Sequence, residues 1–173
     1  MQDHKKELLV KAEKTAEALI YKLKERSLTL ALAESCTAGI VSALLAGIPG
    51  ASEVLWGSFV TYTKEAKVSM LGIEEKIPET FGLVSKETAC AMAQGALRKS
   101  NAGIAASVTG LAGPAGDGSN VRVGTVWTAA ALRPTSASEK GEITAMERHF
   151  TGTRNEVRIN AAIAALEMLQ TID

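Results

Sequence analysis

Apolar side chains recur at every third or fourth position in several stretches of the chain, with charged side chains between them. In residues 5–25 the apolar positions include Leu8, Ala12, Leu19 and Leu23, while lysines and glutamates occupy the other face. This spacing predicts an amphipathic helix. Alanine-rich composition, a capping residue such as Ser85 or a terminating glycine predicts further helices. These are expected at 38–48, 64–71, 86–99 and 153–170.

Shorter apolar runs without helical spacing predict β-strands. They are rich in alanine, β-branched or aromatic side chains and are bounded by polar or glycine-containing segments. The expected strands cover residues 28–33, 54–62, 102–109, 123–132 and 142–151. Loops are expected at 78–82, at the glycine-rich 110–120 and at the polar 133–141.

Strands and helices alternate along most of the chain, which predicts an α/β fold with helices on both faces of one sheet. The last two expected strands have no helix between them and are expected to form an antiparallel hairpin. The sheet is therefore expected to be mixed but mostly parallel. A length of 173 residues suits one domain, and the sequence contains no repeat or linker, so a single domain over residues 1–173 is expected.

The composition is typical of a globular protein, with 46% hydrophobic and 22% charged residues. The formal net charge is zero, which gives no basis for binding nucleic acid or an anionic membrane surface. The N-terminus lacks the uninterrupted apolar segment of a secretory signal, and no apolar run is long enough to span a membrane. Two cysteines, Cys36 and Cys90, do not make a disulfide framework. We therefore expect a cytoplasmic protein.

Polar residues gather where three of the expected strands end. The three groups are residues 34–39, 62–67 and 109–118. Ligands of open α/β sheets bind beyond the carboxyl ends of the strands. If the three strands that end at these groups are parallel neighbours, all three groups lie at one edge of the sheet. That edge is the expected site.

Ser35 lies in a strand-to-helix turn, where the following backbone N–H groups can hold an oxyanion or a phosphate. The alternative, which spacing alone favours, is that Ser35 or Thr37 only caps the helix. Cys36 is a rival nucleophile, although free cysteines are usually buried and inert. The two histidines, His4 and His149, are not expected at a strand end facing this edge.

The scarcity of histidine makes a lysine the expected general base, and Lys67 falls one turn into the helix that begins after Tyr62. A lysine base requires its pKa to fall from about 10.4 to about 7–8, through burial or a neighbouring cation. The alternative is a solvated lysine. Tyr62 either donates a proton or ends a strand with a half-buried ring. Lys64, Glu65 and Glu34 remain open as bases, and Glu34 is expected to point away from the serine.

The segment 110–120 is dense in glycine, which lets the backbone approach a ligand closely. It matches neither the Walker pattern nor the dinucleotide-binding fingerprint, so a phosphate- or ribose-holding loop and a flexible turn are equally open. Asp117 has no second carboxylate or histidine nearby, so no metal site is expected. Arg154 and Arg158, in the first turns of the last helix, either pair with a phosphate or lie at the surface.

Six segments of the chain occur in the order in which one protein family carries them. They are ALAESCTAG, GSFVTYTKEAK, GLVSKETA, SVTGLAGPAGDG, VGTVW and HFTGTRNEVR. Together they resemble the CinA C-terminal-domain family, the nicotinamide-nucleotide amidases, in its stand-alone form. The resemblance implies a three-layer α/β/α sandwich that hydrolyses nicotinamide mononucleotide to nicotinate mononucleotide and ammonia, with no metal or organic cofactor.

The resemblance implies Ser35 as the nucleophile, Lys67 as the base and Tyr62 as a proton donor to the departing ammonia. Two positions depart from the family's pattern, since Ala38 stands for a glycine and Lys64 for an asparagine. Lys64 is expected to share a helix face with Lys67 and to lower its pKa by repulsion. The residues expected to contact the substrate are Cys36, Thr37, Gly39, Thr109, Gly110, Ala112, Gly113 and Arg154.

A second hypothesis is a non-catalytic nucleotide-binding module that serves a competence or DNA-damage-response complex. Release of ammonia from nicotinamide mononucleotide distinguishes the two hypotheses. In both, the expected partner is a small-molecule nucleotide, with no nucleic acid and no membrane. A homo-oligomer, foremost a dimer, is also expected.

Overall fold

The structure of the protein, a computed structural model, describes residues 2–134 and 141–172. The elements follow one another as α1 Gln2–Glu25, β1 Leu30–Glu34, α2 Ile40–Ala46, the 3₁₀ helix η1 Ala51–Glu53, β2 Leu55–Val60, α3 Lys64–Leu71, α4 Lys76–Phe81, α5 Lys86–Lys99, β3 Ile104–Gly110, β4 Thr125–Leu132, β5 Ile143–His149 and α6 Arg154–Gln170. Most of the polar loop predicted at 133–141 lies outside the described residues.

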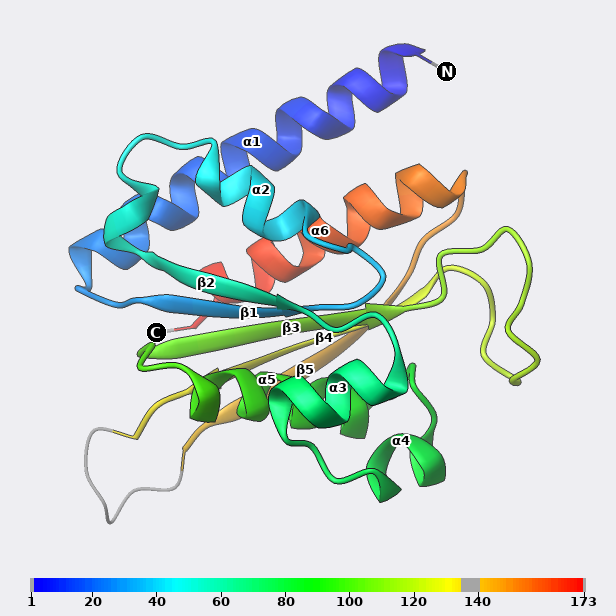
Figure 1. The fold of residues 1–173 in the computed structure, drawn as a ribbon. Helices are drawn as coiled ribbons and strands as arrows, with labels where there is room; N and C mark the ends of the chain where they lie inside the picture. Colours follow the sequence, from blue (N-terminus) through cyan, green and yellow to red (C-terminus); the bar gives the residue numbers. More distant parts are fainter. Residues whose placement is uncertain (1, 135–140, 173) are drawn as a thin grey trace.

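The five strands form one sheet in the order β2-β1-β3-β4-β5 (Figure 1). β1 pairs in parallel with β2 on one side and with β3 on the other. β4 is antiparallel to both β3 and β5, so four of the five strands run in the same direction. The predicted mixed sheet is confirmed, and its last two strands form the predicted hairpin.

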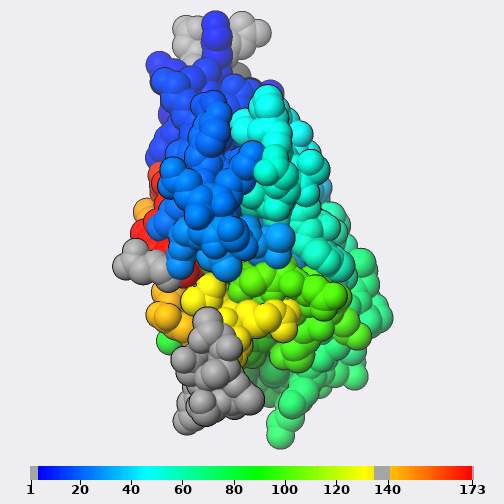
Figure 2. Space-filling model, turned by 90° about the vertical axis from the view of Figure 1, so that its left-hand side faces the viewer, coloured from blue at the N-terminus to red at the C-terminus, as the bar shows by residue number. Residues whose placement is uncertain are grey.

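Helices cover both faces of this sheet. α1, α2 and α6 lie on one face, and α3, α4 and α5 lie on the other (Figure 1). Figure 2 shows the same layers from the side, with α1 and α2 in blue and cyan above the yellow end of β4, and the green segments below. The predicted three-layer α/β/α sandwich is therefore confirmed.

The inner strands are buried on both faces because helices cover each face. All five residues of β1 are buried, and its four apolar residues alternate between two apolar clusters. Leu30 and Leu32 pack with α1, α2 and α6, whereas Ala31 and Ala33 pack with residues of α3 and α5. Successive strand residues point to opposite faces, so this alternation fixes which side of the sheet each following residue reaches.

Residues 78–82 are predicted as a loop, but the structure places the end of helix α4 there. Pro78 lies in the first turn of α4, where backbone N–H groups have no partner within the helix. The proline therefore removes no hydrogen bond, and its fixed φ suits a helix start. The loop prediction is wrong because a proline near a helix start does not interrupt the helix.

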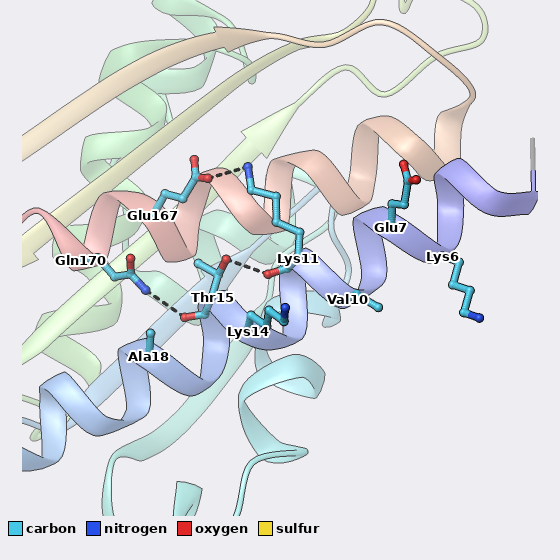
Figure 3. A pocket seen from close by; sticks show the side chains of 9 residues that line it. All are labelled: Lys6, Glu7, Val10, Lys11, Lys14, Thr15, Ala18, Glu167 and Gln170. Carbon is cyan, nitrogen blue, oxygen red and sulfur yellow. Dashed lines mark hydrogen bonds and ion pairs between the residues drawn. The ribbon is translucent and has the colours of Figure 1, made fainter.

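α1 is the longest helix that the structure describes, with 24 residues. A groove of about 800 Å³ runs between it and the end of α6, lined by charged side chains together with Val10, Thr15, Ala18 and Gln170 (Figure 3). An ion pair of 2.8 Å joins Lys11 to Glu167 across this groove.

No helix in the described part of the chain has both the length and the apolar composition needed to cross a lipid bilayer.

Candidate active site

β1, β2 and β3 end side by side at one edge of the sheet. Glu34, the last residue of β1, is level with Val60 of β2 and with Val108 of β3. The three strands are parallel, so the residues that follow them all emerge at this edge. The expected juxtaposition of the three polar groups is confirmed, and β1 carries Ser35 to the middle of it.

Ser35 and Lys67 are in contact at this edge. The Nζ atom of Lys67 lies 2.9 Å from Ser35 Oγ and 2.7 Å from the carbonyl oxygen of Thr61. The lysine is only 1% exposed, and it is the largest of the fully buried side chains. A neutral amine in this position donates one N–H to the Thr61 carbonyl and turns its lone pair toward the serine hydroxyl.

Burial lowers the pKa of Lys67 to about 8, because removing an ammonium from water disfavours its charged form. The neighbouring cation expected from the sequence does not act here. Lys64 Nζ binds Glu75, the N-cap of α4, at 2.8 Å and Glu79 of α4 at 2.9 Å, and these carboxylates raise the pKa of Lys64. The expectation that Lys64 lowers the pKa of Lys67 is therefore wrong.

Glu34 holds the start of α2. Its carboxylate accepts hydrogen bonds from the backbone N–H groups of Gly39, Val41 and Ser42, and from the Ser58 hydroxyl. This buried carboxylate faces α2 and takes the place of a side-chain N-cap. The alternative that Ser35 or Thr37 caps the helix is wrong, since the helix N-cap is Gly39.

The turn between Ser35 and α2 contains two residues with left-handed backbone. Ala38 has φ 50° and Gly39 has φ 96°. Only glycine adopts this region without steric cost, and other residues pay about 1–2 kcal/mol. The alanine that departs from the expected glycine pattern therefore stands at a strained position beside the nucleophile.

Cys36 is not suited to act as the nucleophile. It is 4% exposed, and burial raises the pKa of its thiol to about 12. The backbone N–H groups of Cys36 and Thr37 have no acceptor among the described residues. Two free N–H groups directly after a nucleophile are the donors that an oxyanion requires.

Arg154 joins two of the strand-end segments. Its Nη2 donates to Tyr62 Oη at 2.7 Å, and its Nη1 donates to the carbonyl oxygen of Gly113 at 2.6 Å. A capping box of Thr153 and Glu156 fixes the start of α6, from which the arginine extends. Tyr62 is 52% exposed, so its ring is open to a ligand.

A pocket of about 140 Å³ lies around the serine–lysine pair. It is lined by Ser35, Cys36, Tyr62, Lys67, Leu83, Val84, Thr109, Gly110, Leu111, Ala112, Asp117 and Arg154. The structure therefore brings together all three residues expected to be catalytic and five of the eight expected to contact substrate. Thr37, Gly39 and Gly113 do not line the pocket.

The glycine-rich strand end forms one wall of the pocket. Gly110 lies so close to β4 that a Cβ there would be 2.8 Å from Val126 Cγ2 and 3.2 Å from Cys36 Sγ. The buried Thr109 hydroxyl donates to the Leu83 carbonyl at 2.8 Å, so it fastens the 82–85 segment to the sheet. Leu83 and Val84 form the apolar wall that sequence reasoning missed, because only a tertiary contact brings them there.

Arg158 is the other residue whose role the sequence did not determine. Its Nε donates to the carbonyl oxygen of Cys36 at 3.0 Å and its Nη2 to that of Thr37 at 2.9 Å. It thus holds the backbone of the serine turn instead of lying free at the surface. Arg154 and Arg158 are four residues apart, so both lie on one face of α6. This spacing was the signal in the sequence that Arg158 lies near the site.

His149 departs from the expectation that neither histidine ends a strand at this edge. His149 is the last residue of β5, and β5 runs in the same direction as β3, so His149 does end a strand at this edge. It lies on the outermost strand beyond β4, with Nδ1 3.5 Å from the Thr125 hydroxyl. His149 does not line the Ser35 pocket. His4 is an exposed residue of α1.

Comparisons with known proteins agree with this architecture. The CinA-like protein of Thermotoga maritima is 40% identical over 161 residues, which cover 93% of this chain and 38% of that protein. The putative competence-damage inducible protein of Symbiobacterium thermophilum is 42% identical over 154 residues, which cover 86% of this chain and 35% of that protein. The chain thus spans less than two fifths of the length of these relatives.

Solved structures match over most of the chain. The competence/damage inducible protein CihA from Agrobacterium tumefaciens gives a TM-score of 0.85 at 39% identity, covering 92% of this chain and 94% of that one. The competence damage-inducible protein A from Klebsiella pneumoniae gives 0.86 at 27% identity, covering 92% and 96%. The model of the CinA C-terminal domain matches residues 12–172. The chain therefore belongs to the CinA C-terminal-domain family.

Proposed function

We propose that the protein hydrolyses the carboxamide of nicotinamide mononucleotide to give nicotinate mononucleotide and ammonia. The observation that carries the proposal is the 2.9 Å contact between Ser35 Oγ and the buried Nζ of Lys67. A serine hydroxyl is a weak nucleophile until a base takes its proton. A lysine whose pKa lies near 8 is such a base at neutral to mildly alkaline pH.

In the first step, Ser35 Oγ attacks the carboxamide carbon and its proton passes to the neutral Lys67 amine. The carbonyl oxygen becomes an oxyanion, which the free N–H groups of Cys36 and Thr37 stabilise. Collapse of this intermediate breaks the C–N bond, and the nitrogen leaves as ammonia after receiving the proton of Lys67 by way of the Tyr62 hydroxyl, which returns the lysine to its neutral form. Water then attacks the resulting ester and gives a proton to Lys67, which passes it to Ser35 Oγ as the carboxylate product leaves.

Tyr62 and Arg154 lie on the exposed side of the pocket and are suited to the rest of the substrate. The Tyr62 oxygen accepts a hydrogen bond from Arg154, so its own O–H remains available to donate a proton toward the departing nitrogen. The guanidinium has five N–H donors, and two bonds to protein atoms leave others for the phosphate group.

The lining of the pocket matches a flat ring joined to an anionic group. Leu83, Val84 and Leu111 supply apolar contact, and the Tyr62 ring offers a stacking face. Arg154 supplies positive charge at the other side. A nicotinamide ring attached to a ribose phosphate has this combination of a flat aromatic ring and an anion.

The test is to incubate the purified protein with nicotinamide mononucleotide and to measure ammonia and nicotinate mononucleotide together. Equal amounts of both products are expected from the wild type and none above background from Ser35→Ala. Free nicotinamide and nicotinamide riboside should react more slowly, because neither carries the phosphate. Tight binding of the mononucleotide without any ammonia would instead favour the non-catalytic binding module.

A further inference from the structure

Arg158 holds the turn that carries the nucleophile. The residue is partly buried in the second turn of α6, and its side chain spans from that helix to the β1–α2 turn. Nε and Nη2 bind two successive carbonyl oxygens, those of Cys36 and Thr37. A single guanidinium thus fixes the orientation of two consecutive peptide groups.

Fixing these carbonyls also fixes the N–H groups of the same peptides. A peptide group is planar and trans, so its N–H points opposite to its C=O. The carbonyl of Cys36 shares a peptide with the N–H of Thr37, which has no acceptor among the described residues. The carbonyl of Thr37 shares a peptide with the N–H of Ala38, which is bonded to the Ser35 carbonyl at 3.0 Å.

The turn requires such an anchor because it is not held by regular structure. Ala38 adopts a left-handed backbone with φ 50°. Such a strained conformation persists only where surrounding contacts hold it. Glu34 fastens the turn only from Gly39 onward. Within the described part of the chain, Arg158 is the side chain that binds the backbone between Ser35 and Ala38.

We propose that Arg158 is a positioning residue that holds the Thr37 N–H in place for the oxyanion. It holds the Cys36 N–H indirectly, because the Ala38 N–H that it orients donates to the Ser35 carbonyl, which belongs to the same peptide as the Cys36 N–H. This inference rests on the proposed amidase function. The charge of the guanidinium adds a second effect, because a cation bound to a carbonyl polarises the whole peptide group and makes its N–H a stronger donor. Arg158 does not line the pocket, so it acts through the turn and not on the substrate.

The experiment compares Arg158→Met and Arg158→Lys with Arg148→Met, a control arginine on β5 away from the pocket. Arg158→Met should lower kcat by about 10²-fold, the scale of a misplaced catalytic group, and change KM by less than about threefold. Arg158→Lys should recover part of kcat, since an ammonium can bind one of the two carbonyls. Arg148→Met should retain wild-type kcat. A kcat of Arg158→Met within about threefold of wild type would overturn the proposal.

A second measurement does not depend on turnover. The backbone order of the Cys36 and Thr37 amides, measured by heteronuclear NOE in an NMR experiment, should fall in Arg158→Met and stay unchanged in Arg148→Met. Unchanged order would overturn the positioning role even if kcat fell. If the wild type released no ammonia, the proposed amidase function would fail, whereas the order of these amides would still decide whether Arg158 positions the turn. If Arg158→Met does not fold, Arg158→Lys carries both measurements.

Discussion

Replacing Lys67 by methionine should change how the stability of the protein depends on pH. Burial moves the pKa of this lysine from 10.5 to about 8. Between these pH values the unfolded chain holds the proton and the folded chain has lost it, so the free energy of unfolding rises with pH. At about 1.4 kcal/mol per pH unit, the buried lysine costs the folded state roughly 3 kcal/mol below pH 8, and this cost disappears as the pH approaches 10.5.

Methionine has a similar length and no charge, so the unfolding free energy of Lys67→Met lacks the cost of the buried charge. At pH 7 two effects of the substitution oppose each other. The variant is relieved of the roughly 3 kcal/mol cost of the buried charge, but the Thr61 carbonyl loses its donor, which costs about 1–3 kcal/mol. We therefore expect the variant to be about as stable as the wild type at pH 7, and less stable than the wild type near pH 10.5.

The assay is urea unfolding at several pH values between 7 and 10.5, followed by fluorescence of Trp56 and Trp127. The difference in unfolding free energy between the wild type and Lys67→Met should change by roughly 3 kcal/mol over this range. Other lysines titrate in both proteins and cancel in the difference. Lys14→Met, on an exposed position of α1, serves as the matched control. Parallel stability curves for the wild type and Lys67→Met would refute the lowered pKa.

The same pKa sets the pH dependence of activity. The neutral amine is the base, so kcat/KM should rise with pH through about 8 and level off above it. At pH 7 about a tenth of the protein has the neutral amine, which predicts roughly a tenfold increase toward the plateau. Lys67→Met should lower kcat by about 10²–10⁴-fold. If the variant keeps more than about a tenth of the wild-type kcat, Lys67 is not the base.

Ser35→Ala should lower kcat at least ~10³-fold without loss of the fold, whereas Cys36→Ala should stay active. Ammonia release measures the activity and thermal unfolding the stability. The reverse result would make the cysteine the nucleophile. Arg154→Ala should mainly raise KM for the mononucleotide, and an unchanged KM with unchanged stability would remove it from the site. Ala38→Gly should raise the free energy of unfolding by about 0.5–1 kcal/mol, because relief of about 1–2 kcal/mol of strain outweighs the greater chain entropy of glycine; a destabilised variant would contradict the left-handed backbone.

The sequence was sufficient to predict which strand ends form the candidate site because the signals there are local and agree with one another. Continuous apolar runs at 28–33 and 102–109 indicate strands covered on both faces. Polar residues follow directly at their carboxyl ends, and helical patterns begin soon after them. Once such strands are taken as parallel neighbours, the convergence of Ser35, Tyr62 and Thr109 at one edge follows from chain direction alone.

What the sequence could not determine depends on side-chain direction and on contacts between distant segments. A spacing of three residues put Lys64 and Lys67 on adjacent parts of α3, but it did not show that one faces α4 and the other the core. Glu75 and Glu79 could act on Lys64 only once α4 was recognised as a helix. Arg158 is 121 residues from the Thr37 carbonyl that it binds, and the helix face that it shares with Arg154 did not show that it holds the serine turn.

Two features that cost stability lie within a few residues or contacts of Ser35. Lys67 is a large cation-forming side chain in a buried position, and Ala38 holds a left-handed backbone. Elsewhere in β1 the local preferences agree with the fold, since its apolar residues alternate between the two helix layers. A concentration of unfavourable features at one place is expected where chemistry, and not packing, selects the residues.

The two features differ in kind, however. The charge cost of Lys67 is inseparable from its use as a base, whereas the strain of Ala38 can be relieved by glycine without removing any group of the site. A gain in stability from Ala38→Gly with unchanged kcat would therefore separate the cost that catalysis requires from the cost that it does not.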